Sequence, residues 1–235
     1  MLSRIFLTAH PTPRLSDEEC AQLEAAIART VNFDARSIIV RENQPLTNCT
    51  LLLAGIAYRY KDTEEGKRQI LALHYPGDFV DLHSYPLKRL EHTVGALTAV
   101  QMAVVPHDAI CRLTETSSRL TELLWKSTLV DAAMNREWLT SVGARAGVAR
   151  VAHLFCEAYV RLRMIGGTRG WTFDFPLTQL DLGEATGLTS VHANRMLRRL
   201  REPGILTFRN GVASIGDWQK LCEIAEFDDN YLFLD

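Results

Sequence analysis

A basic segment near the carboxyl end carries the side chains with the clearest chemical potential. From Ser190 to Arg201 the sequence holds four arginines and no acidic residue, in a chain whose formal net charge is −2. Guanidinium groups neutralise phosphates, and each can also donate two hydrogen bonds to the major-groove edge of guanine. This local excess of positive charge indicates a surface that binds nucleic acid.

A first short helix is expected just before this segment. Thr178 can cap it, and Gly187 can end it because glycine tolerates a left-handed turn. The apolar residues Leu180, Leu182 and Ala185 are expected to face inward from this helix.

A second helix and a hairpin should follow at once. Thr189 can cap this helix, and one buried face is predicted from the spacing of Ala193, Met196, Leu197 and Leu200. Asn210-Gly211 lies between two apolar runs, which is typical of a β-hairpin. Helix, turn, helix and hairpin in this order predict a winged helix-turn-helix, with Arg209 at the tip of the wing.

The run Leu188–Arg201 (LTSVHANRMLRRLR) resembles the DNA-reading helix of the Crp/Fnr family of bacterial transcription regulators. The resemblance implies an α+β chain in three parts. These are a double-stranded β-helix (jelly-roll) sensor domain over residues 1–116, a dimerisation helix and hinge over 117–143, and a winged helix-turn-helix over 144–235. The implied partners are double-stranded DNA, a second copy of the chain, RNA polymerase and a small-molecule effector.

The family pattern also divides the DNA contacts between bases and phosphates. Base-reading positions are expected at Ser190, Val191, His192, Asn194 and Arg195. Phosphate contacts, which position the domain without reading sequence, are expected at Thr178, Gln179, Thr189, Arg198, Arg199 and Arg209.

The amino-terminal half shows short strand-like segments after one helix. Ser16 and Glu19 have the spacing of a capping box for a helix over 16–30. Apolar and β-branched segments follow at 36–40, 50–53, 56–60, 69–73 and 93–105. Their spacing predicts a small antiparallel barrel or roll.

A long helix is expected from about residue 117 to residue 142. Its apolar residues spread over more than one face, which favours packing on its own domain and on a second chain. Gly143 and Gly147 bracket the expected hinge.

The segment that binds cyclic nucleotides in the family departs from its pattern here. Leu82 stands where the family has a ribose-binding glutamate, and Glu91 or His92 stands at the place of the phosphate-binding arginine unless a gap shifts Arg89 in. Cyclic AMP is therefore not the expected ligand. The candidate effector pocket comprises Leu82, His83, Ser84, Arg89, His92 and Thr93.

Metal and cofactor sites are not expected from the sequence. The five cysteines are scattered with no CxxC pair, so Cys20 alone cannot hold an iron–sulfur cluster. The spacing of His74, His83 and His92 marks neither a haem nor a metal site. No apolar run approaches a membrane span, so a cytoplasmic protein is expected.

Two alternatives stay open. One keeps the fold but makes DNA binding constitutive, with a degenerate sensor. The other is a cupin-like metal-dependent enzyme, which would need histidines and a carboxylate to converge inside the barrel.

Overall fold

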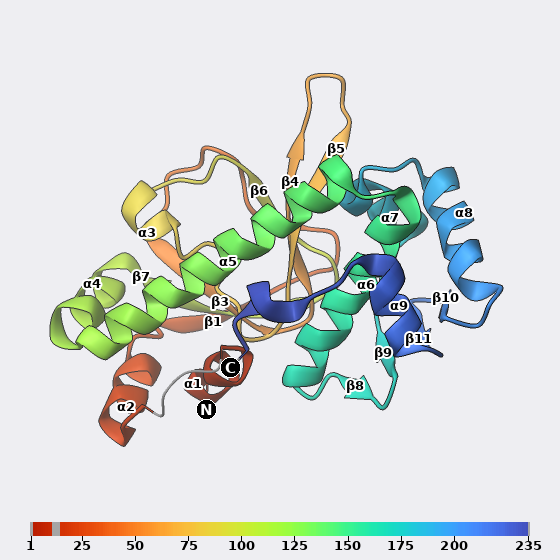
Figure 1. The fold of residues 1–235 in the computed structure, drawn as a ribbon. Helices are drawn as coiled ribbons and strands as arrows, with labels where there is room; N and C mark the ends of the chain where they lie inside the picture. Colours follow the sequence, from red (N-terminus) through yellow and green to blue (C-terminus); the bar gives the residue numbers. More distant parts are fainter. Residues whose placement is uncertain (1, 11–14, 235) are drawn as a thin grey trace. The chain divides into compact units, whose positions relative to one another are not determined.

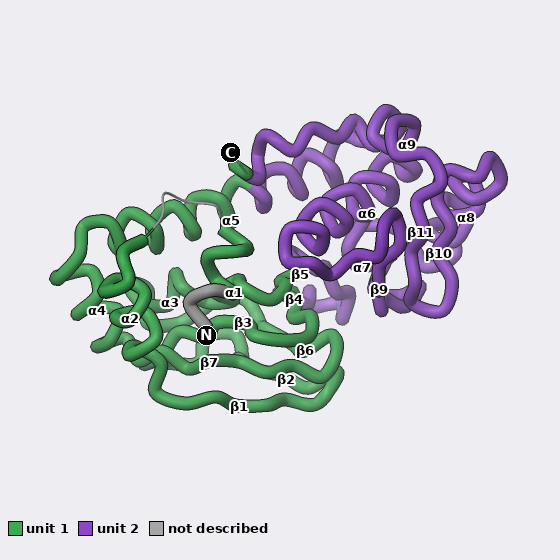
Figure 2. Tube along the Cα trace, turned by 90° about the horizontal axis from the view of Figure 1, so that it is seen from below, with its two compact units in different colours: residues 1–61, 73–133, 233–235 green, residues 62–72, 134–232 purple. Residues whose placement is uncertain are grey.

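A computed structural model describes residues 2–10 and 15–234 of the chain (Figure 1). It divides into two compact units (Figure 2). Unit 1 comprises residues 1–61, 73–133 and 233–235, and unit 2 comprises residues 62–72 and 134–232. The predicted boundaries at 116/117 and 143/144 stay predictions.

Two antiparallel sheets, with helices around them, are built mainly from unit 1, and residues 62 and 68–72 of their strands belong to unit 2. The helices of this part of the chain are α1 (Leu2–Ala9), α2 (Asp17–Ala25), α3 (Ser84–Leu87), α4 (His107–Thr116) and α5 (Ser118–Ala144). The strands are β1 (Arg29–Phe33), β2 (Ile38–Val40), β3 (Asn48–Ala54), β4 (Ala57–Asp62), β5 (Arg68–His74), β6 (Thr93–Ala96) and β7 (Val100–Pro106).

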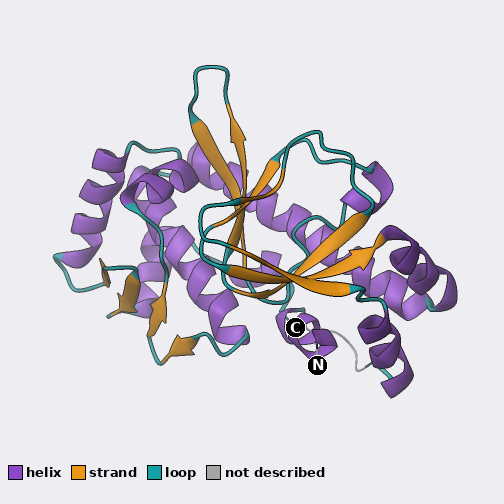
Figure 3. Ribbon diagram, turned by 180° about the vertical axis from the view of Figure 1, so that it is seen from behind, coloured by secondary structure: helices purple, strands orange, loops and turns teal. Residues whose placement is uncertain are grey.

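The sheets have the orders β1-β7-β3 and β2-β6-β4-β5 (strands in orange in Figure 3). Leu52 on β3 and Met102 on β7 belong to the apolar core that also takes residues from β2, β4 and β6. Their neighbours Leu51 and Ala103 point into a second core with α1, α2, α4 and α5. Because both faces of β3 are covered, its second half, Leu51–Ala54, is apolar without interruption. The expected antiparallel roll is confirmed as a sandwich.

The first predicted helix is shorter than expected. Its capping box is present, with Ser16 N donating to Glu19 Oε2 over 2.8 Å and Glu19 N donating to Ser16 Oγ over 3.2 Å. The helix ends at Ala25, and Arg29 instead begins β1, which pairs with β7 from Arg29 opposite Val104. The prediction of helix to residue 30 was wrong because this pairing with a distant strand is not visible in local sequence.

The long helix is α5, 27 residues from Ser118 to Ala144, and it is shared between the two units. Leu120, Leu123 and Leu124 are buried in the core of unit 1. Trp125 and Leu129, one turn apart, are 65% and 54% exposed. The helix therefore buries one face and leaves apolar side chains on another.

Unit 2 contains the carboxyl-terminal helices and a small sheet of order β10-β11-β9-β8. The elements are α6 (Gly147–Met164), β8 (Thr168–Arg169), β9 (Thr172–Asp174), α7 (Gln179–Thr186), α8 (Ser190–Arg201), β10 (Leu206–Arg209), β11 (Val212–Ile215), α9 (Trp218–Ala225) and a 3-10 turn (Asp229–Leu232). In the described part of the chain, no helix is long and apolar enough to cross a membrane.

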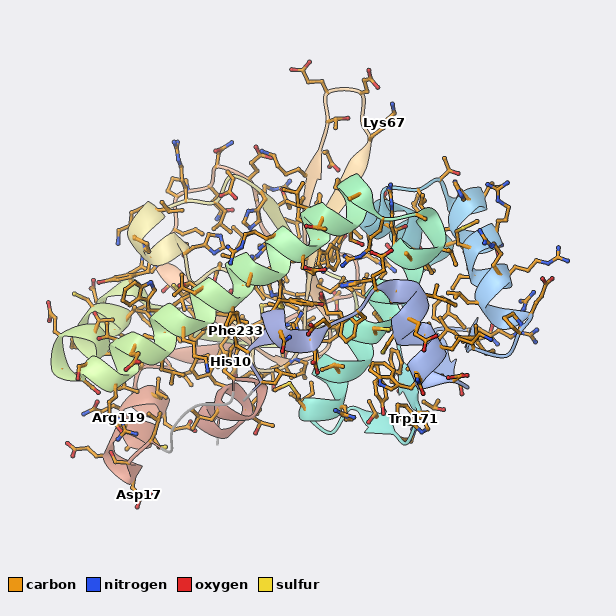
Figure 4. The ribbon with its side chains drawn as sticks, in the orientation of Figure 1. His10, Asp17, Lys67, Arg119, Trp171 and Phe233 are labelled. Atoms are coloured by element: carbon orange, nitrogen blue, oxygen red, sulfur yellow. The ribbon has the colours of Figure 1, made fainter. Side chains whose placement is uncertain are left out.

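Aromatic rings hold α6 against the small sheet. Phe155 on α6 packs edge-on against Phe175 and Phe208, with ring centroids 5.1 and 5.2 Å away. Tyr159 stacks on Trp171, which lies between β8 and β9 (Figure 4). This aromatic core gives α7 and α8 a rigid support.

Candidate nucleic-acid interface

The first helix of the motif, α7, begins and ends where the sequence predicts. Thr178 Oγ1 accepts from Asp181 N over 3.1 Å, and Thr178 N donates to Asp181 Oδ2 over 2.7 Å, which completes a capping box. Gly187 ends the helix with φ 65°. Leu182 is fully buried, but Leu180 is 61% exposed. The prediction that Leu180 faces inward was wrong, because two residues along a helix turn a side chain to nearly the opposite side.

Close contact between α7 and the following turn depends on Gly183. A Cβ at this position would lie 2.6 Å from the backbone oxygen of Leu188. Leu188 N also donates to Gly183 O over 2.9 Å. Only glycine allows this approach, so Gly183 fixes how α8 leaves the turn.

The second helix, α8, has one buried and one exposed face, as predicted. Thr189 caps it, with Oγ1 accepting from His192 N over 3.2 Å. The buried residues are Ala193, Met196, Leu197 and Leu200. Val191 is 80% exposed, and Asn194 and Arg195 are exposed as well. Val191 can therefore make an apolar contact with a ligand, and the side chains of Asn194 and Arg195 can make polar ones.

The charge on the exposed face is available for a ligand. Arg195, Arg199 and Arg209 form no ion pair with any residue that the structure describes. Arg198 Nε lies 2.7 Å from Glu202 Oε1, and both side chains are exposed. Such a surface pair contributes about 0–1 kcal/mol, so a phosphate can displace Glu202 at little cost.

Not every predicted contact residue is equally open. Gln179 is exposed, and Ser190 is half-buried. The hydroxyls of Thr178 and Thr189 are both engaged as helix caps. His192 is half-buried, and its Nε2 lies 3.4 Å from the position of a Cβ on Gly147, the first residue of α6. The His192 ring therefore packs against α6.

The wing is a two-residue hairpin. Leu206 pairs with Ile215 and Arg209 with Val212 across β10 and β11. Asn210 and Gly211 have φ 51° and 75°, the left-handed values that this tight turn needs. Arg209 is exposed at the end of β10, as the sequence predicts.

The predicted effector pocket is only partly assembled, all of it in unit 1. The rings of His83 and His92 lie 5.3 Å apart between centroids. Leu82 instead joins the apolar core beneath α4 and α5. Ser84 is fully buried, and its Oγ lies 3.2 Å from His107 Nε2.

The remaining pocket candidates differ in exposure. Arg89 is exposed, whereas Thr93 is half-buried and its Oγ1 accepts from Glu42 N over 3.3 Å. The structure therefore brings His83 and His92 together but not the full predicted set.

Sequence reasoning missed the buried cation of this unit, Arg59 on β4, which is 4% exposed. Its Nε donates to Val80 O over 3.0 Å, and its Nη1 donates to Asp131 Oδ2 over 2.6 Å. The one signal was an arginine inside the apolar strand run Ala57–Tyr60.

Comparisons with known proteins agree with this architecture. Residues 149–224 match the family model of the Crp-like helix-turn-helix domain, and residues 30–117 match that of the cyclic nucleotide-binding domain.

Relatives match over most of the chain. The transcriptional activator protein FnrL of Cereibacter sphaeroides is 24% identical over 223 residues, which cover 92% of this chain and 88% of that protein. The nitrogen fixation regulation protein FixK of Bradyrhizobium diazoefficiens is 24% identical over 206 residues, 84% of this chain and 85% of that protein. The structure of FixK2 from Bradyrhizobium japonicum superimposes with a TM-score of 0.77 at 23% identity, covering 84% of this chain and 97% of that one.

Both domain models match within one chain, and the two relatives are named a transcriptional activator and a nitrogen fixation regulation protein. The chain belongs to the Crp/Fnr family of transcription regulators.

Proposed function

We propose that the protein is a homodimer that binds a two-fold operator in double-stranded DNA through α8 and regulates transcription there. The observation that carries this proposal is the exposed face of α8, where Val191, Asn194 and Arg195 lie beside Arg199, and neither of these two arginines forms an ion pair with a described residue. A helix of this width and charge fits the major groove, with its first turns at the base edges.

The contacts divide into two groups. Arg195 is suited to the O6 and N7 atoms of guanine, and Val191 to a thymine methyl group. Arg198, Arg199 and Arg209 carry the charge for phosphates at the two sides of the groove. Because the His192 ring packs against α6, we assign it to positioning α8 rather than to reading bases.

Dimerisation is supported by the exposed apolar side chains of α5. Trp125, Leu129 and Leu139 are 65%, 54% and 72% exposed along this one helix. Exposed apolar side chains repeated along a long helix are typical of a helix–helix interface. Two copies would present two reading helices to two half-sites.

Regulation would act through coupling between the sensor and reading domains rather than through catalysis. In this proposal the protein works in the cytoplasm beside RNA polymerase, and the glycines at 143 and 147 flank the hinge.

A selection of binding sites from a random duplex pool tests the proposal. We expect enriched sites with inverted half-sites about one helical turn apart, and an affinity that falls steeply with salt. Sedimentation should give twice the chain mass of 26.4 kDa. No enrichment together with salt-independent binding would refute DNA recognition.

A charge placed on α5 separates dimerisation from folding. Leu129→Glu should shift the protein to the single-chain mass and weaken operator binding, because a buried carboxylate is costly at an apolar interface. Arg112→Glu, which adds a carboxylate at an exposed position of α4, is the control and should stay dimeric. A dimer that survives Leu129→Glu would place the interface elsewhere.

A further inference from the structure

Three metal-ligating side chains that are separated in sequence meet in unit 1. His83 lies immediately before α3, whereas Glu91 and His92 lie immediately before β6. One ligand atom from each of the three residues lies within 4.8 Å of the other two. His92 Nδ1 lies 3.0 Å from Glu91 Oε1.

The cluster runs from the interior to the surface. His92 is 3% exposed, His83 is half-buried, and the side chain of Glu91 is 68% exposed. Within the described residues, His92 Nε2 is buried and has no hydrogen-bond partner. A buried polar nitrogen without a partner is costly, and in native proteins such a group is normally satisfied by water or an ion.

Electrostatics keep both imidazoles neutral at pH 7. Burial, with the nearby Arg59 cation adding to it, lowers the pKa of His83 to about 4. The same two causes lower the pKa of His92. Burial opposes ionisation of Glu91, but its own backbone amide and His92 outweigh burial, and the pKa of Glu91 is lowered.

We propose that His83, Glu91 and His92 bind one divalent transition-metal ion of the zinc type, with water completing the coordination. Two imidazoles and one carboxylate with an open position are a ligand set that Zn²⁺ takes readily. Ca²⁺ and Mg²⁺ prefer oxygen ligands, so two imidazoles select against them.

The present spacing is close to what the ion requires. Metal–ligand distances of about 2.0–2.2 Å place tetrahedral ligand atoms about 3.4 Å apart. The three ligand atoms lie within 4.8 Å of one another, so no pair has to close by more than about 1.4 Å. The Glu91 side chain is exposed and can rotate toward the two imidazoles without disturbing the core.

This site does not depend on DNA binding, because it lies wholly within unit 1. Its test uses the full-length protein without an affinity tag, stripped with a chelator and dialysed. Zn²⁺ is titrated by calorimetry, and Co²⁺ serves as a spectroscopic probe whose visible absorption reports the coordination. We expect one ion per chain.

Two variants and a control assign the ligands. Glu91→Gln and His83→Asn should each lower Zn²⁺ affinity at least tenfold and change the Co²⁺ spectrum, since loss of even an outer partner costs 10–100-fold. Glu64→Gln, at another exposed carboxylate, between β4 and β5, should bind as the unaltered protein does. Equal melting temperatures without metal would show that the fold is intact.

The results decide the proposal in either direction. Binding of one ion that both ligand variants weaken, and that the control retains, supports the site. Binding of less than one ion per chain, or unaltered affinity in either Glu91→Gln or His83→Asn, would overturn it.

Discussion

The guanidinium of Arg59 on β4 donates a hydrogen bond to the carboxylate of Asp131 on α5, with 2.6 Å between Nη1 and Oδ2. The two side chains are 5% and 22% exposed. Burial works against ionisation of Asp131, but Arg59 outweighs it, and the pKa of Asp131 is held below its ordinary value. The long helix is therefore tied to the sandwich by a largely buried ion pair.

Arg59→Met should lower the free energy of unfolding by about 3–5 kcal/mol, because it removes the guanidinium that is paired with the largely buried Asp131 carboxylate. Urea unfolding followed by circular dichroism measures this. Lys61→Met, on the same strand, removes an exposed pair with Glu42 at 3.6 Å and should cost less than about 1 kcal/mol. Equal losses in the two variants would show that the buried pair contributes no more than the exposed one.

His74 should make the protein sensitive to mild acid. Burial first, and Arg59 second, lower the pKa of this fully buried imidazole from 6.5 to about 4. Above pH 6.5 both folded and unfolded chains carry it neutral, so its contribution to stability is complete there. Between pH 6.5 and about 4 only the unfolded chain takes up the proton, and stability falls as pH falls.

The comparison of the unaltered protein with His74→Gln isolates this effect. The unfolding free energy of the unaltered protein should fall by about 3 kcal/mol more than that of His74→Gln between pH 7 and pH 4. Burial raises the pKa of Asp81 to about 7, so protonation of Asp81 stabilises the folded chain as pH falls. Asp81 is present in both proteins, so its contribution cancels in the difference. A difference that does not vary with pH would contradict the prediction.

Gly183→Ala should destabilise the helix-turn-helix. The added Cβ would lie 2.6 Å from Leu188 O, so α7 and the turn must separate, at a cost of about 1–3 kcal/mol. Operator affinity should fall with it, because α8 leaves from this turn. Gly143→Ala is the matched control: it lies in α5 with nothing within 4 Å, and alanine there should be neutral or stabilising. Thermal unfolding of both variants distinguishes crowding from a general effect of alanine.

Arg195→Ala should weaken binding to the selected operator by about 1–3 kcal/mol more than binding to unrelated DNA, because it removes a bidentate base contact. Arg169→Ala is the control, since β8 lies at the opposite edge of the small sheet from the wing strand β10. Fluorescence titrations at one fixed salt concentration measure the affinity of each variant for the operator and for unrelated DNA. Equal losses on operator and unrelated DNA would assign Arg195 to a phosphate instead.

Local signals predicted the reading motif well. Thr178, Gly187 and Thr189 act through contacts within four residues, and Asn210-Gly211 sets its own turn, so neighbouring sequence contains the necessary information. Leu180 was misplaced because α7 has only eight residues, too few for the periodicity to correct one position.

Contacts between distant residues could not be read from the sequence. Strand β1 forms by pairing with β7, about seventy residues away along the chain. Arg59 meets Asp131, and His83 meets Glu91 and His92, only once the sheets and α5 have assembled. The sensor chemistry therefore depends on the tertiary fold, whereas the reading helix depends on local capping and turns.

The eleven residues from Asp62 to Ala72 belong to unit 2, although residues 61 and 73 on either side belong to unit 1. Lys67 marks the loop of this segment in Figure 4, and Gln69 Nε2 donates to Glu184 O on α7 over 2.7 Å. No single cleavage of the backbone can release the whole of unit 2 as one fragment, because part of it is inserted within unit 1. A gene fragment that starts near residue 134 would lack Gln69, which donates to the Glu184 carbonyl. A complete unit 2 would therefore need a second peptide carrying residues 62–72, or a chain in which that segment is joined to residues 134–232.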